Sequence, residues 1–158
     1  MIRILVVGSI KESFYKEAFA EYKKRLSRYD CIEVAEVKDE KTPDKASDSV
    51  NYKILLTEGQ RLLEKIKDND FVVALAIKGR RLDSNSFAYN LDKWRSSLRG
   101  RLCFVIGGSL GLSEEVLKRA DYKLSFSEMT FPHQLMRVIL AEQIYRAFRI
   151  INNEPYHK

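Results

Sequence analysis

Residues 102–111 read Leu-Cys-Phe-Val-Ile-Gly-Gly-Ser-Leu-Gly, five apolar residues followed directly by a glycine-rich segment. An unbroken apolar run of this length is typical of a strand that is buried on both faces, as in a parallel sheet. Glycines after such a strand let the backbone approach a ligand closely and expose N–H donors, but they also suit a plain strand-to-helix turn. The stretch therefore predicts a parallel strand whose carboxyl end carries either a ligand site or a tight turn.

Strand-like and helix-like segments alternate along the rest of the chain. Apolar runs predict strands at 2–7, 31–37, 71–77 and 122–125. Apolar residues spaced three and four apart predict helices within 14–29, 54–66, 84–98 and 132–151, and a short helix follows Ser113. This alternation indicates an α/β domain with a mainly parallel sheet, and the length of 158 residues fits a single domain, 1–158.

A few residues set the expected ends of the helices. Ser84 and Ser113 are the expected N-caps of the third helix and of the short helix. Leu98 is expected to be the last buried residue of the third helix. Gly59 should weaken the second helix, and residues 152–155 should end the last one. The charged segment 38–49 contains Pro43 and is expected to be a loop.

Composition excludes several classes of protein. Apolar residues make up 45% and charged residues 32%, which is typical of a soluble globular chain. No apolar run approaches the length of a membrane span, and the first residues do not resemble a signal peptide, so we expect a cytoplasmic protein without a membrane partner. Cys31 and Cys103 lack CxxC spacing and are expected in the core. With only His133 and His157 as histidines, no metal site is expected.

The motifs of common nucleotide-binding and hydrolytic sites are absent. A single glycine, Gly8, follows the first strand, which counts against an ordinary dinucleotide fold. The sequence contains no P-loop, no nucleophile elbow and no HExxH motif. In parallel sheets, ligands bind at the carboxyl ends of the strands. The loops after the third, fourth and fifth strands are therefore the places where a site is expected.

The chain is basic, with a formal net charge of +6. Such a charge favours a polyanionic partner through counterion release, although many basic proteins bind no nucleic acid. Basic residues cluster at 23–25, at Arg99 with Arg101, and at Arg146 with Arg149, and the first of these groups fits an ordinary solvated helix face. The group made by Lys78, Arg80 and Arg81 differs because it directly follows the third strand, and it is a candidate contact with RNA phosphates.

A second candidate site is the segment 124–133, which joins the fifth strand to the last helix. It offers hydroxyls, apolar walls and free backbone groups, a mixture that suits an amphipathic ligand with an adenine ring and a ribose. Pro132 should open the helix and place His133 in its first turn, with Arg137 one turn later on the same face. The helix dipole there disfavours a protonated imidazole, so a neutral His133 could accept a proton.

Taken together, these segments resemble the RlmH family of 23S ribosomal RNA pseudouridine N3-methyltransferases. The resemblance extends over the full chain, from Val6-Val7-Gly8 to the ending Pro155-Tyr156-His157-Lys158. Between these ends it rests on segments that include the glycine-rich stretch and the start of the last helix, namely 75–79, 105–112, 124–125, 130–133, 137–138 and 145–147.

The resemblance implies a fold, a cofactor and a partner. The fold would be that of a SPOUT methyltransferase, with a trefoil knot in the C-terminal half, which ordinary topology rules make very improbable. The protein would be a homodimer that binds S-adenosylmethionine in a bent form and methylates pseudouridine 1915 in assembled ribosomes. The residues that would line the cofactor site are Leu75, Gly107, Gly108, Leu124, Ser125, Phe126, Ser127, Glu128, Met129, Thr130 and Phe131.

Methylation of N3 requires that its proton leave. We expect His133 to be the general base, with His157 as the competitor. Arg137 would hold a phosphate or stabilise negative charge on the base. In the tail, Tyr156 could stack on a base, His157 could accept a proton and Lys158 could contact a phosphate, although such tails are often frayed and idle.

Two other functions fit the same residues. One is a non-catalytic RNA-binding factor associated with the ribosome, in which the glycine-rich stretch is only a turn. The other is an oxidoreductase that binds a nicotinamide through that stretch. Binding of S-adenosylmethionine would separate the methyltransferase from both.

Overall fold

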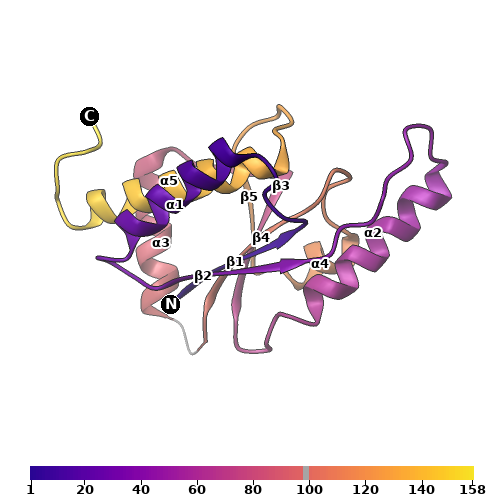
Figure 1. The fold of residues 1–158 in the computed structure, drawn as a ribbon. Helices are drawn as coiled ribbons and strands as arrows, with labels where there is room; N and C mark the ends of the chain where they lie inside the picture. The colour runs from indigo at the N-terminus through magenta and orange to yellow at the C-terminus, as the bar shows by residue number, and fades with distance from the viewer. Residues whose placement is uncertain (98–99) are drawn as a thin grey trace.

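The computed structural model describes residues 1–97 and 100–158 and is built around one five-stranded sheet (Figure 1). The strands are β1 (Ile2–Val7), β2 (Ile32–Val37), β3 (Phe71–Arg81), β4 (Leu102–Ile106) and β5 (Tyr122–Ser125), in the order β2-β1-β4-β3-β5. All four strand pairings are parallel. The expected α/β architecture with a parallel sheet is confirmed, whereas the trefoil knot stays a prediction.

Helices cover both faces of the sheet (Figure 1). Side chains of α1 (Ser13–Leu26), α3 (Ser84–Ser96) and α5 (His133–Ile151) form one apolar cluster with one side of the strands. Side chains of α2 (Asp48–Leu63) and α4 (Glu114–Arg119) form a second cluster on the other side. Successive residues of a strand point to opposite faces, so Ile4 joins the first cluster and Leu5 the second. This explains why the strands are apolar without a break.

The structure corrects several expected boundaries. Cys31 lies just before β2 and is exposed, so its expected place in the core is wrong, whereas Cys103 is buried. The third helix is capped by Asp83 and not by Ser84, because the Asp83 carboxylate accepts a hydrogen bond from the Ser86 amide at 2.7 Å. Ser113 does cap α4. The predictions for Leu98 and Arg99 lie outside the described residues.

The third strand is longer than the sequence predicted. It continues through the basic residues to Arg81, and its pairing with β5 shifts register between Leu75 and Arg80. A Cβ on Gly79 would lie 2.7 Å from the backbone of Leu124, which explains the glycine within this strand. The basic group is therefore held on a strand extension beside β5 and not in a free loop.

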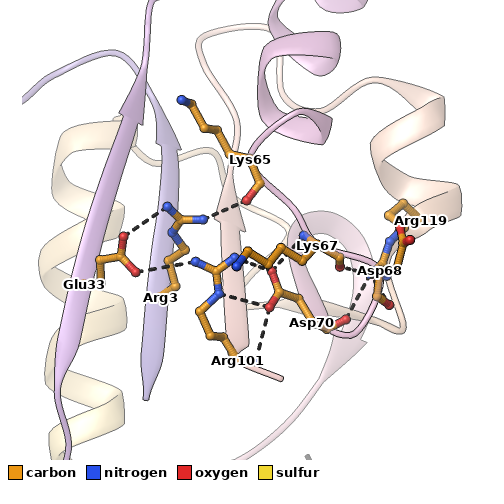
Figure 2. A network of polar contacts seen from close by, with 8 residues as sticks. All are labelled: Arg3, Glu33, Lys65, Lys67, Asp68, Asp70, Arg101 and Arg119. Atoms are coloured by element: carbon orange, nitrogen blue, oxygen red, sulfur yellow. Dashed lines mark hydrogen bonds and ion pairs between the residues drawn. The ribbon is translucent and has the colours of Figure 1, made fainter. Parts of the chain in front are cut away.

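Ion pairs and hydrogen bonds tie the amino ends of the strands together (Figure 2). Asp70 precedes β3 and is only 4% exposed, and both of its carboxylate oxygens are bonded. Oδ1 accepts from the Arg101 amide at 3.2 Å and from Nε at 3.0 Å, and Oδ2 accepts from Arg101 Nη2 at 2.7 Å and from the Lys67 amide at 2.9 Å. Arg101 also pairs with Glu33, which in turn binds Arg3. Ion pairs and hydrogen bonds therefore connect the residues at this edge of the sheet.

Replacing Asp70 should destabilise the fold. Burial alone would raise the pKa of Asp70, but the hydrogen bonds from Arg101 hold it below its ordinary value of 3.8. Asp70→Asn removes the carboxylate closest to the partly buried Arg101 guanidinium and leaves it only Glu33 at 3.6 Å, so we expect a loss of about 3 kcal/mol in the free energy of unfolding, measured in urea. Glu21→Gln, which breaks an exposed pair with Arg25, should leave the midpoint nearly unchanged.

The sign of the Asp70 contribution also follows from the lowered pKa. The stabilisation is present above the ordinary pKa of an aspartate and is lost as the pH falls through the lower pKa of the folded state. The unaltered protein and Asp70→Asn should therefore have similar free energies of unfolding at acid pH. Equal stability of Asp70→Asn and the unaltered protein at neutral pH would contradict the prediction.

Candidate functional site

A cavity of about 610 Å³ opens at the carboxyl edge of the sheet. Its walls come from the three neighbouring strands β4, β3 and β5 and from the start of α5. The loops that follow these three strands are the ones in which a site was expected. The strand order places them side by side at one edge of the sheet. The described residues that line it are Leu75, Ala76, Ile77, Ile106, Gly107, Gly108, Ser109, Leu110, Gly111, Leu124, Phe126, Ser127, Met129, Thr130, Phe131, Pro132, His133 and Met136.

Nine of the eleven residues expected at the cofactor site are among these lining residues. The other two are Ser125 and Glu128. Ser125 is buried beside the cavity, where its hydroxyl donates to the Ser127 carbonyl at 3.1 Å. Glu128 points outward and pairs with Arg81 at 2.7 Å, both side chains being largely exposed. The segment 124–131 therefore curves so that only part of it faces the cavity.

Sequence reasoning did not assign several lining residues. Ala76, Ile77 and residues 109–111 continue the two loops that were expected to line a site, so their contiguity with expected residues was a usable signal. Met136 lies one helical turn after His133 on α5 and faces the same cavity. Its spacing from His133 could have identified it, but Met136 was interpreted only as one of the apolar residues of the last helix.

The glycine-rich stretch is both a tight turn and a cavity wall. The Gly111 amide donates to the Gly108 carbonyl at 3.1 Å, and Gly111 has a positive φ of 85°. A Cβ on Gly107 would lie 2.2 Å from the Gly111 carbonyl oxygen, so the turn itself requires a glycine there. A Cβ on Gly108 would meet Glu58 Oε2 at 3.0 Å and Val7 Cγ1 at 3.1 Å. Both glycines are thus constrained by protein contacts even before a ligand is considered.

His133 is the first residue of α5 and is half-buried at the cavity wall. Burial lowers its pKa, and the charges of Arg137 and Lys11 act in the same direction, while Asp39 opposes them. The imidazole is therefore neutral at neutral pH and can accept a proton. The expected character of His133 as a neutral residue beside a ligand cavity is consistent with this geometry.

Arg137 occupies a different place from the one expected. Its side chain is 1% exposed and does not line the cavity. Nη1 donates to Glu36 at 2.7 Å, and Nη2 donates to the carbonyls of Gly8 at 2.5 Å and Val7 at 3.4 Å. In this arrangement the guanidinium is bound by protein groups, so it holds the carboxyl end of β1 and the start of α5 together instead of facing a phosphate.

The tail packs against α5 through the side chain of Tyr156. Tyr156 packs edge-on to Tyr145 at 5.0 Å between ring centroids, and its hydroxyl donates to Glu142 at 3.2 Å. Tyr156 is partly buried and packs on the core cluster, so this part of the tail is not idle. Burial raises the pKa of Tyr156 to about 12. Its ring also lies under the Arg146 guanidinium, at 4.7 Å.

A second cavity of about 450 Å³ lies beside the first. It shares the walls Leu124 and Phe126 with the main cavity and is also lined by His157. The His157 Nδ1 atom lies 3.3 Å from Arg146 Nη1, which keeps the imidazole near this cavity. The tail histidine and His133 therefore approach the same wall of aromatic and apolar residues from two sides.

The predicted RNA-contact residues are all exposed and lie outside both cavities. Lys78, Arg80 and Arg81 follow one another on the end of β3, and Lys158 ends the chain. Among the described residues, no three His, Cys, Asp or Glu side chains are grouped so that they could hold a metal ion. No described helix is both long and apolar enough to cross a membrane.

Known proteins resemble the chain over its full length. A family model described as "Predicted SPOUT methyltransferase" matches residues 1–157. The chain is 54% identical to the ribosomal RNA large subunit methyltransferase H 1 of Clostridium perfringens and 56% identical to the ribosomal RNA large subunit methyltransferase H of Clostridium botulinum, in each case over 99% of both chains.

A solved structure shares the fold at low sequence identity. The probable methylase family protein from Haemophilus influenzae superimposes with a TM-score of 0.57 at 16% identity, covering 99% of this chain and 70% of that one. At this identity the similarity extends to the fold alone.

The protonation of His133 can be measured directly. We expect its imidazole resonances in an NMR titration to give a pKa below the ordinary 6.5, because burial and Arg137 both disfavour the charged form. His133→Asn, which removes the signal, assigns the resonance. A pKa at or above the ordinary value would show that the imidazole is more exposed to water than the structure indicates.

Proposed function

Because the chain belongs to the SPOUT methyltransferase family, we propose that it transfers a methyl group from S-adenosylmethionine to N3 of pseudouridine 1915 in the 23S rRNA of assembled ribosomes. The protein is a methyltransferase of large-subunit ribosomal RNA, as its full-length similarity to enzymes of that name establishes. The observation that carries the proposal is the cavity formed by the loops after β3, β4 and β5, which contains most of the residues expected at the cofactor site.

The cavity fits S-adenosylmethionine in size and in chemistry. About 610 Å³ lies within the range of ligand pockets of roughly 300–1,000 Å³. Leu75, Leu124 and Phe126 offer apolar walls for an adenine ring, and Ser127 and Thr130 lie on the same wall segment with hydroxyl groups. The backbone turn at 107–111 forms one wall of the cavity. When bound, this cofactor supplies a methyl group already activated by its sulfonium.

Catalysis then requires alignment of the methyl group with N3 and removal of the N3 proton. His133 supports the second task because it is neutral at the cavity wall. His157 remains the competing base, since the second cavity that it lines shares two residues with the first. Arg137 acts as a positioning residue, because its hydrogen bonds to Gly8 and Glu36 fix the start of α5 behind His133.

The remaining proposals concern partners. Exposed Lys78, Arg80 and Arg81 on the end of β3, with Lys158, would contact RNA phosphates near the cavity. A homodimer is supported by α5, on which several apolar residues stay only half-buried in the single chain, namely Leu135, Met136, Val138, Ile139 and Ile151.

We further propose that residues 1–158 form one domain and that the protein works in the cytoplasm, where its ribosomal substrate lies.

The cofactor assignment can be tested at Gly108. A valine there would press on Glu58 and Val7, so the loop would have to move from the cavity wall. We expect Gly108→Val to weaken S-adenosylmethionine binding in calorimetry by about tenfold or more, which corresponds to about 1.4 kcal/mol. Thermal unfolding controls for global damage. Unchanged affinity in a folded Gly108→Val protein would remove this loop from the cofactor site.

The target assignment can be tested at the tail. Deleting Tyr156 to Lys158 should abolish methylation of 23S rRNA, read by mass spectrometry of rRNA from cells that carry only the truncated protein. His157→Ala, which leaves the packing of Tyr156 intact, should reduce methylation without the loss of stability expected for the deletion. Cofactor affinity should stay near normal in His157→Ala. Full methylation by the truncated protein would show that the tail has only a structural role. If the unaltered protein also failed to methylate 23S rRNA, the alternative of a non-catalytic RNA-binding factor would be favoured.

A further inference from the structure

The fold contains two carboxyl groups that are both 4% exposed, and their surroundings differ sharply. Asp70 lies at the amino edge of the sheet, and both of its oxygens are bonded (Figure 2). Glu58 lies on α2 at the carboxyl edge. Its Oε1 accepts from the Glu40 amide at 2.9 Å, whereas Oε2 has no hydrogen-bond partner among the described residues. Because an unpaired buried carboxyl oxygen destabilises the fold, Oε2 of Glu58 points to a role other than stability.

The unpaired oxygen of Glu58 lies directly behind the glycine-rich stretch. It would be 3.0 Å from a Cβ on Gly108, which places it in contact range of that residue's backbone. The next residue of α2 is packed even more tightly, since a Cβ on Gly59 would lie 2.2 Å from the hydroxyl of Ser113. Two successive residues of α2 therefore press on the two ends of the segment 108–113. Gly59, which was expected only to weaken the helix, permits this approach.

The other oxygen of Glu58 holds the segment 38–47, which leads from β2 to α2. Its hydrogen bond to the Glu40 amide is supported by Arg61, which donates to the Lys38 carbonyl at 2.8 Å and pairs with Glu40. Thr42 of this segment reaches across to Ser109, with 3.3 Å between the hydroxyl oxygens. Glu58 thus binds this segment through Oε1, while Oε2 lies next to Gly108 in the wall of the main cavity.

We propose that Glu58 is a positioning residue of the cofactor site, which fixes the backbone at Gly108 by joining it to the segment 38–47. The inference rests on the proposed binding of S-adenosylmethionine in the main cavity. Glu58 is itself buried behind the wall, so it acts through the loop and does not touch the ligand. Burial raises the pKa of Glu58, and the neighbouring Asp39 and Glu40 push it in the same direction. Both effects favour the neutral acid, which a glutamine closely imitates.

Three variants test this role against a merely structural one. Glu58→Ala should raise the Kd and the KM for S-adenosylmethionine by about tenfold, with kcat within about twofold, because the loop is misplaced while the reacting groups are intact. Glu58→Gln keeps the shape and the acceptor for the Glu40 amide, so its Kd should rise by less than about threefold. Asp70→Asn, the matched change at the opposite edge, should lower thermal stability and leave the Kd unchanged. Glu58→Asp, which is one methylene too short, provides the same readout as Glu58→Ala should the latter not fold.

The outcomes separate this inference from the proposed function. Equal affinity of Glu58→Ala and the unaltered protein for S-adenosylmethionine would overturn this inference alone. A loss of affinity in Glu58→Gln as large as in Glu58→Ala would also overturn it, because charge and not the joining of two segments would then be the cause. Absence of binding by the unaltered protein would overturn both the proposed function and this inference.

Discussion

Strand β4 pairs with β1 on one side and with β3 on the other, and all five of its residues are buried. A strand in this position must be apolar on both faces, which requires helices on both sides of the sheet. Its insertion between β1 and β3 also decides which strands are neighbours at the carboxyl edge. The end of β4 therefore lies next to β3, which lies next to β5 in turn. The main cavity exists because of that adjacency.

The polar groups at the two edges of the sheet differ in how fully they are hydrogen-bonded. At the amino edge, both oxygens of the buried Asp70 carboxylate accept hydrogen bonds from Arg101 and the Lys67 amide, and Arg101 also pairs with Glu33. At the carboxyl edge, the half-buried His133 lines the main cavity, and Oε2 of Glu58 has no hydrogen-bond partner among the described residues. Polar groups without a partner in the protein are expected at a functional site, because a ligand site needs groups that are free to bind the ligand.

Several features followed from residue patterns alone. The positions of the strands apart from the end of β3, the parallel sheet, and a last helix expected from Pro132 and found from His133 were predicted, because buried parallel strands and amphipathic helices leave different periodicities. Ser113 was recognised as a cap because its place before two acidic residues is a local signal. The end of β3 was missed, since a charged run such as 78–81 normally signals a loop, and only the pairing with β5 holds it extended.

The sequence by itself determined the α/β class, the apolar strands, the glycine-rich turn and the stretches that would supply a cavity, because these depend on local spacing and burial. Only the tertiary structure decided which of these residues face the cavity. It turned Glu128 outward to Arg81, buried Arg137 against Gly8 and Glu36, and packed Tyr156 on α5. It also placed Glu58 behind Gly108, although 50 positions separate them in the chain. Such contacts depend on strand order and on the approach of α2, and neither leaves a local pattern in the sequence.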